Sequence, residues 1–225
     1  MSEASNPHFI ARPDFSRLYI LGAGGFAREV AWLAEQSWGK SVRLEFLVDS
    51  EEYLSEDING IRVRLLSEIT AGSSDRFVTA VGSGELRDRL SNAAIGRGLR
   101  PATVTHPRAE MSEFVSIGSG TVICAGCILT TNITIGQHVQ INLDCTLGHD
   151  VVVDDYASLA PGVHVSGNVR IGRGAYIGTG ASIIDGSATS PLIIGEGATV
   201  AAGACVTRNV DPGALVAGVP AVRKK

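Results

Sequence analysis

The dipeptide His149-Asp150 joins two side chains that are well suited to move a proton. An imidazole titrates near neutral pH and can act as a general base, and a neighbouring carboxylate can fix its tautomer and stabilise the imidazolium. His149 follows the aliphatic Leu147 by two residues, so we expect its ring to face outward. From the residues alone, a surface histidine without a role is the alternative.

A glycine-rich turn is the second candidate for chemistry. Gly22-Ala-Gly-Gly25 follows a short apolar stretch, and Gly22-x-Gly24-x-x-Ala27 formally matches the dinucleotide fingerprint, with Asp49 at the end of the next expected strand. Backbone N–H groups at such a turn can hold phosphates, and Asp49 could accept a hydrogen bond from a base or ribose. The region has room for only about three strands, which favours a nucleotide sugar over NAD. A turn that only permits tight packing is the alternative.

Metal and redox chemistry are weaker alternatives. His138, His149 and His164 could converge between subunits as zinc ligands, but their spacing matches no known ligand set, and we expect no metal. Cys124-Ala-Gly-Cys127 is formally a C-x-x-C motif without a second pair. We expect these cysteines to pack as small buried side chains.

The elements that position these residues fall into two regions with different periods. Strands are expected at 18–21, 44–48 and 77–81, and helices at 26–36 and 85–96. Strands that alternate with helices predict a parallel sheet with crossover connections.

From about residue 111 the sequence has a period of six. Small or β-branched residues follow four positions after each aliphatic one, and the register breaks at 186–190 before it resumes at 194. Such a period predicts a parallel β-helix with a loop extruded at the break and a cap after 210. The aliphatic positions are Ile117, Ile123, Leu129, Ile135, Ile141, Leu147, Val153, Leu159, Val165, Ile171, Ile177 and Ile183.

Bulk composition sets the remaining limits. The chain has 225 residues, 44% of them hydrophobic, and a formal net charge of −4. This charge gives no reason to expect nucleic acid or an anionic membrane as a partner, and no apolar run is long enough to span a bilayer. Residues 1–16 lack the layout of a secretory signal, so we expect a flexible leader and a cytoplasmic protein.

The repeat, the glycine turn and Gly218-Val-Pro-Ala221 together resemble the hexapeptide-repeat acyltransferases. Ile141-Asn-Leu-Asp-Cys-Thr-Leu-Gly-His-Asp150 and Ser166-Gly-Asn168 narrow this resemblance to the nucleotide-aminosugar N-acetyltransferase and sialic acid O-acetyltransferase group. The resemblance implies a left-handed β-helix, a homotrimer, and acetyl-CoA in a groove between neighbouring coils. We therefore expect a nucleotide-sugar-binding α/β domain of half-Rossmann type at 17–105, an acyltransferase β-helix at 106–210, and a cap with a basic tail at 211–225.

The resemblance also implies residue roles. His149 matches the catalytic base and Asp150 its acidic companion, while Gly167 matches a backbone contact near the thioester. Some relatives have a histidine where this chain has Phe26. The expected acceptor and nucleotide-sugar residues are Gly22, Gly24, Gly25, Phe26, Asp49, Ser50 and Asn142, and the expected acetyl-CoA residues are Ser158, Gly167, Thr179, Ala202, Arg223 and Lys224.

The function implied is N-acetylation of a nucleotide-linked 4-amino sugar by direct transfer from acetyl-CoA, in bacterial surface glycan assembly. O-acetylation of a sialic or related sugar on the same scaffold is the first alternative, and a non-catalytic β-helix scaffold is a remote one. The basic residues Arg223 and Lys224 could reach the phosphates of coenzyme A or form a solvated tail.

Overall fold

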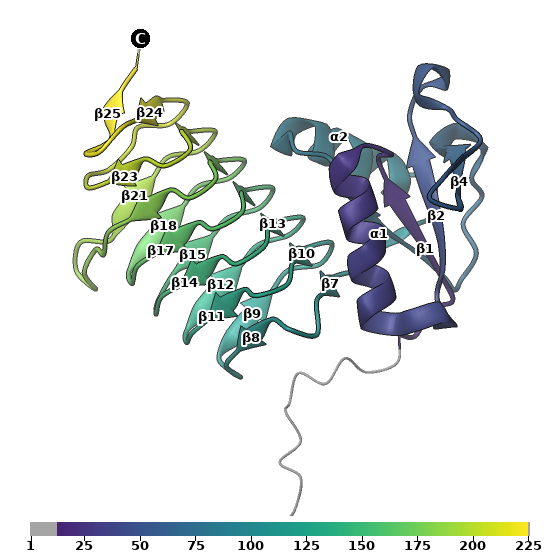
Figure 1. The fold of residues 1–225 in the computed structure, drawn as a ribbon, viewed down its shortest axis with the longest axis horizontal. Coiled ribbons are helices and arrows are strands. Elements are labelled where there is room, and N and C mark those ends of the chain that lie inside the picture. Colours follow the sequence, from purple (N-terminus) through teal and green to yellow (C-terminus); the bar gives the residue numbers. More distant parts are fainter. Residues whose placement is uncertain (1–12, 225) are drawn as a thin grey trace, which may run out of the picture.

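The computed structural model describes residues 13–224, which form an α/β domain followed by a left-handed β-helix (Figure 1). Most of the expected leader, including His8, and the last residue lie outside the described residues. None of the helices within 13–224 is long and apolar enough to cross a membrane.

The α/β domain has a six-stranded sheet in the order β3-β4-β2-β1-β5-β6, and all its pairings are parallel except that of β3 with β4. The elements are β1 (Arg17–Leu21), α1 (Gly25–Trp38), η1 (Gly39–Ser41), β2 (Arg43–Val48), η2 (Glu51–Tyr53), β3 (Asp57–Ile58), β4 (Ile61–Leu65), η3 (Leu66–Glu68), β5 (Asp75–Thr79), α2 (Gly84–Ile95) and β6 (Arg100–Pro101).

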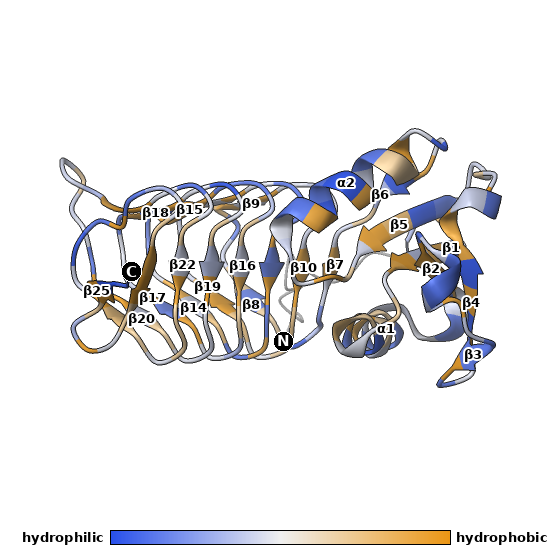
Figure 2. Cartoon of the chain, turned by 90° about the horizontal axis from the view of Figure 1, so that it is seen from above, coloured by the Kyte–Doolittle hydropathy of each residue, from blue (hydrophilic) through white to orange (hydrophobic). Residues whose placement is uncertain are grey.

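The two helices cover opposite faces of this sheet, as Figure 2 shows from above. Apolar side chains of α1, including Val30 and Ala34, pack against Ile20 and Phe46, whereas Leu90 of α2 packs against the other face of the sheet. The α1 cluster continues into the β-helix through Val104, Val122 and Cys124. The two domains therefore share one core.

The β-helix is a three-sided prism of short parallel strands. The first face contains β7 (Val104–Thr105), β10 (Val122–Ile123), β13 (Gln140–Ile141), β16 (Ser158–Leu159), β19 (Tyr176–Ile177), β22 (Thr199–Val200), β24 (Leu215–Ala217) and the antiparallel β25 (Val222–Arg223). The second face contains β8 (Glu110–Met111), β11 (Ile128–Leu129), β14 (Thr146–Leu147), β17 (His164–Val165), β20 (Ser182–Ile183) and β23 (Cys205–Val206). The third face contains β9 (Val115–Ile117), β12 (Ile133–Ile135), β15 (Val152–Val153), β18 (Val169–Ile171) and β21 (Leu192–Ile194).

Three rows of turns join these faces. The first corner, between the first and second faces, contains residues 142–145, 160–163, 178–181 and 201–204. The second corner, between the second and third faces, contains residues 148–151, 166–168 and 184–191. The third corner, between the third and first faces, contains residues 136–139, 154–157, 172–175 and 195–198.

The six-residue period has the structural cause that the sequence predicts. Every aliphatic position from Ile123 to Ile183 is buried in one continuous core, and only Ile117 at the open end is partly exposed. The small or β-branched residues four positions later are buried in the same core from Cys127 to Ala181. Register pairs every strand with its equivalent one coil away, for example Thr146 with His164. The interruption at 184–191 is a loop at the second corner, closed by hydrogen bonds between Ser187 and Ser190.

Candidate active site

His149 and Asp150 lie together at the second corner. The Nδ1 atom of His149 is 2.8 Å from Oδ2 of Asp150, and the two side chains are 57% and 49% exposed. Asp150 adopts a left-handed φ of 59°, a conformation that short polar side chains tolerate and that belongs to the turn. The corner thus brings together two groups that would otherwise point away from one another.

Gly167 lies one coil further along the same corner, directly against the imidazole. A Cβ atom at Gly167 would fall 2.4 Å from Nε2 of His149, so only glycine leaves room for the ring. The N–H of Gly167 donates no hydrogen bond to any acceptor within residues 13–224. An imidazole nitrogen and an unpaired backbone donor therefore lie side by side.

A groove of about 230 Å³ runs along the first face, next to the first corner. It brings together four residues that the sequence assigns to the acceptor or to acetyl-CoA: Phe26, Asn142, Ser158 and Thr179. Phe26 comes from the start of α1 and the others from successive coils, so both domains contribute. We call this cavity the donor groove.

Hydrogen bonds hold the polar side of the donor groove. Ser158 is 7% exposed and its hydroxyl donates to the carbonyl oxygen of Gly82 over 3.4 Å, while Oδ1 of Asn142 accepts from the N–H of Leu143 at 2.7 Å. Ala202, also assigned to acetyl-CoA, lies one coil beyond Thr179 at the same corner. These positions form a line along the prism.

A separate cavity of about 440 Å³ opens where β1, β2 and β5 end. In open α/β sheets, ligands bind at this edge. Gly22, Gly24 and Asp49 line it, as the sequence predicts for a nucleotide site, whereas Gly25 and Ser50 stand beside it without lining it. We call this cavity the acceptor cavity; its other lining residues are Ala23, Leu47, Val48, Tyr53, Ile58, Val81, Leu86, Arg89 and Leu90.

Arg89 completes the polar end of the acceptor cavity and was not expected from the sequence. Its Nη2 atom lies 3.0 Å from Oδ2 of Asp49 and forms an ion pair. The pattern Leu86-x-x-Arg89-Leu90 on an amphipathic helix is a weak signal, because nothing in it indicates which cavity that face of α2 borders.

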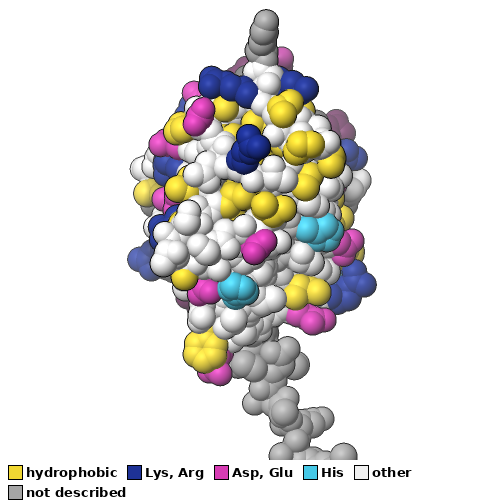
Figure 3. All heavy atoms as spheres, turned by 90° about the vertical axis from the view of Figure 1, so that its left-hand side faces the viewer, with side chains coloured by type: hydrophobic (Ala, Val, Ile, Leu, Met, Phe, Trp, Pro, Cys, Tyr) yellow, Lys and Arg dark blue, Asp and Glu magenta, His cyan; other side chains and the backbone are white. Residues whose placement is uncertain are grey.

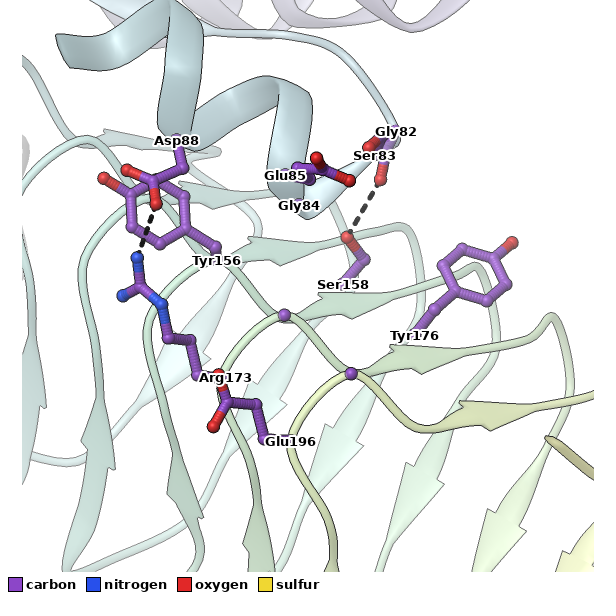
Figure 4. A pocket seen from close by; sticks show the side chains of 12 residues that line it. Gly82, Ser83, Gly84, Glu85, Asp88, Tyr156, Ser158, Arg173, Tyr176 and Glu196 are labelled. Atoms are coloured by element: carbon purple, nitrogen blue, oxygen red, sulfur yellow. Dashed lines mark hydrogen bonds and ion pairs between the residues drawn. The ribbon is translucent and has the colours of Figure 1, made fainter. Parts of the chain in front are cut away.

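A third hollow, of about 620 Å³, lies between the start of α2 and the third corner (Figure 4). Arg173 crosses it from the prism to Asp88 of α2 over 2.7 Å, and its guanidinium lies 4.5 Å from the centre of the Tyr156 ring. Glu85 and Glu196 also border it. No residue expected to contact ligand lines this hollow except Ser158.

The basic tail lies at the far end of the prism. Arg223 and Lys224 belong to the segment that pairs with β24, and Nη1 of Arg223 lies 3.4 Å from Oδ2 of Asp211. The structure does not bring these two side chains to the donor groove.

His138 and His164 lie apart from His149. We expected His138 at an outward position; it does point away from the prism core, but the α/β domain covers it, and its side chain is 1% exposed between the rings of Phe77 and Tyr156. His164 is exposed on the second face and hydrogen-bonded to Thr146. Among residues 13–224, no group of three or more histidine, cysteine or acidic side chains is placed to hold a metal.

The cysteines pack as the sequence predicts. Cys124, Cys127 and Cys145 are buried, and Cys205 is partly exposed. Burial raises the pKa of Cys124 to about 12, and a hydrogen bond with Cys145, followed by burial, raises the pKa of Cys127, which makes both thiols poor nucleophiles.

The predicted residues thus form three groups within one chain. His149, Asp150 and Gly167 share the second corner; Phe26, Asn142, Ser158 and Thr179 share the donor groove; and Gly22, Gly24 and Asp49 share the acceptor cavity. The last two groups adjoin, because Val81 lines the acceptor cavity and Gly82 the donor groove. The histidine group lies at a different edge of the prism.

Comparison with known proteins gives consistent results for both domains. Residues 17–94 match the family described as PglD N-terminal domain. The whole chain is similar to GDP-perosamine N-acetyltransferase of Escherichia coli O157:H7, at 33% identity over 210 residues, which cover 92% of this chain and 95% of that protein.

Solved structures agree across almost the full length. WeeI from Acinetobacter baumannii AYE is 31% identical with a TM-score of 0.87, covering 93% of this chain and 100% of that one. PerB from Caulobacter crescentus, solved in complex with CoA and GDP-perosamine, is 26% identical with a TM-score of 0.84, covering 93% and 98%.

Proposed function

This chain belongs to the family of GDP-perosamine N-acetyltransferases and related hexapeptide-repeat sugar acetyltransferases, and we propose that it transfers the acetyl group of acetyl-CoA to the amino group of a nucleotide-linked 4-amino sugar. The observation that carries this assignment is the adjacency of the acceptor cavity and the donor groove, because Val81 lines the first and Gly82 lines the second. A nucleotide in the first cavity would extend its sugar toward the second.

The acceptor cavity suits the nucleotide. Its apolar walls can cover a base, and the Gly22–Gly24 backbone can approach the phosphates closely. The Asp49 carboxylate offers an acceptor for a base or ribose hydrogen, and Arg89 adds a cation beside it. In the complex of PerB, the bound ligands are CoA and GDP-perosamine, which supports a nucleotide sugar and a CoA thioester as the two substrates here.

The first corner suits the donor. Asn142, Thr179 and Ala202 lie along the first corner, with two coil steps between the first pair and one between the second, so an extended pantetheine arm could follow them. The thioester would then end near Ser158, next to the wall shared with the acceptor cavity.

His149 is the proposed general base. With Asp150 accepting a hydrogen bond from Nδ1–H, the lone pair of Nε2 is free to take a proton from the attacking amine. The amine nitrogen forms a bond to the thioester carbonyl carbon, the C–S bond breaks, and the sulfur takes the proton from the imidazolium of His149, so that coenzyme A leaves as its thiol. In this proposal the N–H of Gly167, which lies beside the same ring and donates to no acceptor in the described residues, donates to the oxygen that gains charge during attack.

We propose a homotrimer, because His149 and the donor groove lie at different corners of one prism and a neighbouring copy could bring them together. Figure 3, seen from the left-hand side of Figure 1, shows apolar side chains interspersed with polar ones on this exposed surface. Exposed apolar residues of the second face and its flanking turns include Ile128, at 42%, and Ile184, at 39%. We assign the reaction to the bacterial cytoplasm, where acetyl-CoA is made, as a step in surface glycan assembly.

The experiment is a thiol-release assay with acetyl-CoA and a panel of UDP-, GDP- and dTDP-linked 4-amino sugars, with free sialic acid as the comparison. We expect turnover with at least one nucleotide-linked amine. Turnover with sialic acid and none of the panel would contradict the assignment.

His149→Asn tests the base in the same assay. We expect turnover to fall at least about a hundredfold, as for loss of a positioned base, with the unfolding transition unchanged. His164→Asn is the matched control, because that ring is also exposed but makes its hydrogen bond to Thr146 on the second face. Near-normal turnover of His149→Asn would exclude His149 from the mechanism.

A further inference from the structure

The guanidinium of Arg87 is the buried joint between the α/β domain and the prism. The side chain comes from α2, is 0% exposed, and forms no ion pair with any acidic group in the described part of the chain. Burial lowers its pKa to about 10, so it stays charged at neutral pH. All of its hydrogen bonds go to neutral oxygen atoms of the two domains.

On the α/β side, Arg87 holds the turn between β5 and α2. Its Nη1 atom donates to the carbonyl oxygens of Val81 and Gly82, both at 3.0 Å. These two residues form the wall between the acceptor cavity and the donor groove. Arg87 therefore bonds both residues of this wall, whereas the hydroxyl of Ser158 bonds only Gly82.

On the prism side, the same guanidinium bonds two successive coils. Nε donates to the carbonyl oxygen of His138 at 3.1 Å, Nη1 donates to Oε1 of Gln140 at 3.1 Å, and Nη2 donates to the carbonyl oxygens of Ala157, at 3.0 Å, and Tyr156. The third corner and the start of the first face are thus tied directly to the turn.

Close packing surrounds this joint. A Cβ atom at Gly84 would fall 2.7 Å from the carbonyl oxygen of Tyr156, so the start of α2 rests on the prism backbone. The His138 ring is stacked between Phe77 of β5 and Tyr156 of the prism, with centroids 5.9 and 5.2 Å apart. These contacts hold α2 and β5 against the third corner beside the hollow that Arg173 crosses.

A buried cation without an anionic partner is expensive, and an apolar side chain of similar volume would stabilise such a joint at least as well. A planar guanidinium with five N–H groups can, however, fix several acceptors in one geometry, which a lysine ammonium cannot. The arrangement therefore indicates that Arg87 fixes the relative position of the two domains rather than raising the free energy of unfolding.

We propose that Arg87 is a positioning residue that fixes the acceptor cavity relative to the donor groove, so that a sugar held by its nucleotide presents its amine to the thioester. This inference rests on the proposed function. Each substrate is held mainly by one domain, so their relative orientation depends on the joint, and orientation supplies much of the rate in a two-substrate transfer.

Arg87→Lys and Arg87→Met test this, with Arg76→Met as the matched control. Arg76 also donates to two carbonyl oxygens, those of Ser73 and Asp75, both at 3.0 Å, but it does so within the α/β domain. We expect kcat per folded molecule to fall at least tenfold for Arg87→Met and less for Arg87→Lys. The Kd values of coenzyme A and of the nucleotide sugar, measured separately by calorimetry, should stay within about threefold of the original.

A role in stability alone would give the opposite pattern. It would lower the unfolding temperature of the two Arg87 variants and leave their kcat per folded molecule unchanged, and that result would overturn the proposal. A loss of affinity that accounts for the whole loss of turnover would overturn it equally.

Hydrogen exchange separates this proposal from the proposed function. If Arg87 holds the turn, Arg87→Met raises amide exchange at 81–86 relative to 160–180, and Arg76→Met does not. Absence of turnover in the unsubstituted protein would count against the proposed function alone. Unchanged amide exchange at 81–86 in Arg87→Met would refute the positioning role of Arg87, whether or not the protein is active.

Discussion

Acidification should destabilise this protein through one buried imidazole. His138 is 1% exposed between two aromatic rings, and its Nδ1 atom has no hydrogen-bond partner within the described residues. Burial, and after it the nearby charge of Arg87, lowers the pKa of His138 from 6.5 to about 4, although Asp155 and Asp88 act in the opposite direction. The folded state therefore disfavours the proton that the unfolded chain takes up.

The sign and size of this change in the free energy of unfolding follow from the linkage between proton binding and folding. Because the pKa is lowered on folding, the stabilisation is fully present above pH 6.5 and is lost as the pH falls toward 4. Each pKa unit corresponds to about 1.4 kcal/mol, so about 3 kcal/mol of the free energy of unfolding should disappear between pH 7 and pH 4. Below pH 4 this contribution should not change further.

Urea denaturation followed by circular dichroism, at fixed protein concentration and several pH values, measures this loss. His138→Asn is the comparison, because asparagine tolerates the left-handed φ of 52° at this position and does not titrate. It should be less stable at pH 7 and show a flatter dependence on pH, by about 3 kcal/mol. Parallel profiles for the two proteins between pH 6.5 and 4 would refute the assignment.

Three further predictions concern close contacts and thiols. Gly84→Ala should lower the free energy of unfolding by about 1–3 kcal/mol, because its Cβ would lie 2.7 Å from the carbonyl oxygen of Tyr156. Gly25→Ala, at the start of α1, is the control, because its Cβ would have only the end of the Arg28 side chain nearby, at 3.8 Å. Its free energy of unfolding should be unchanged in the same urea titration. Gly167→Ala should displace the His149 ring and reduce turnover in the thiol-release assay at least tenfold without lowering the unfolding temperature, and normal turnover would show that the ring is not needed in this position. No more than one thiol, that of Cys205, should react with a thiol reagent in the native protein and all four in urea, since the others are buried; rapid labelling of two or more would contradict this packing.

The prism could be predicted from the sequence because its core is a one-dimensional pattern. Ile141, Leu147 and Val153 are buried for the same reason at every coil, so a count of six places them without knowledge of the rest. The sheet of the α/β domain was predicted less completely, because the hairpin of β3 and β4 was missed. Asn59-Gly60 between two apolar residues is a strong hairpin signal, and both residues have positive φ.

The joint between the domains could not be predicted in this way. Arg87 reads as one more charged residue of an amphipathic helix, and His138 as an outward position of a repeat. Their burial arises only when α2 rests on the third corner, a contact between segments about 50 residues apart that no local period encodes. The same limit applies to the site residues, since the pattern assigns side chains to corners but does not say which corners meet.

The stacking of coils has a metric consequence. Neighbouring parallel strands are about 4.8 Å apart, so the three coil steps from Asn142 through Ala160 and Thr179 to Ala202 span about 14 Å. Distances along the first corner therefore increase in steps of one coil. A coil added beyond Val206 would leave the distances between these residues unchanged. A coil inserted between Ser158 and Thr179 would lengthen the distance from Asn142 to Ala202 by one coil step. Homologues with longer or shorter prisms should then differ at the end that caps the stack and keep the number of coils between these two residues constant.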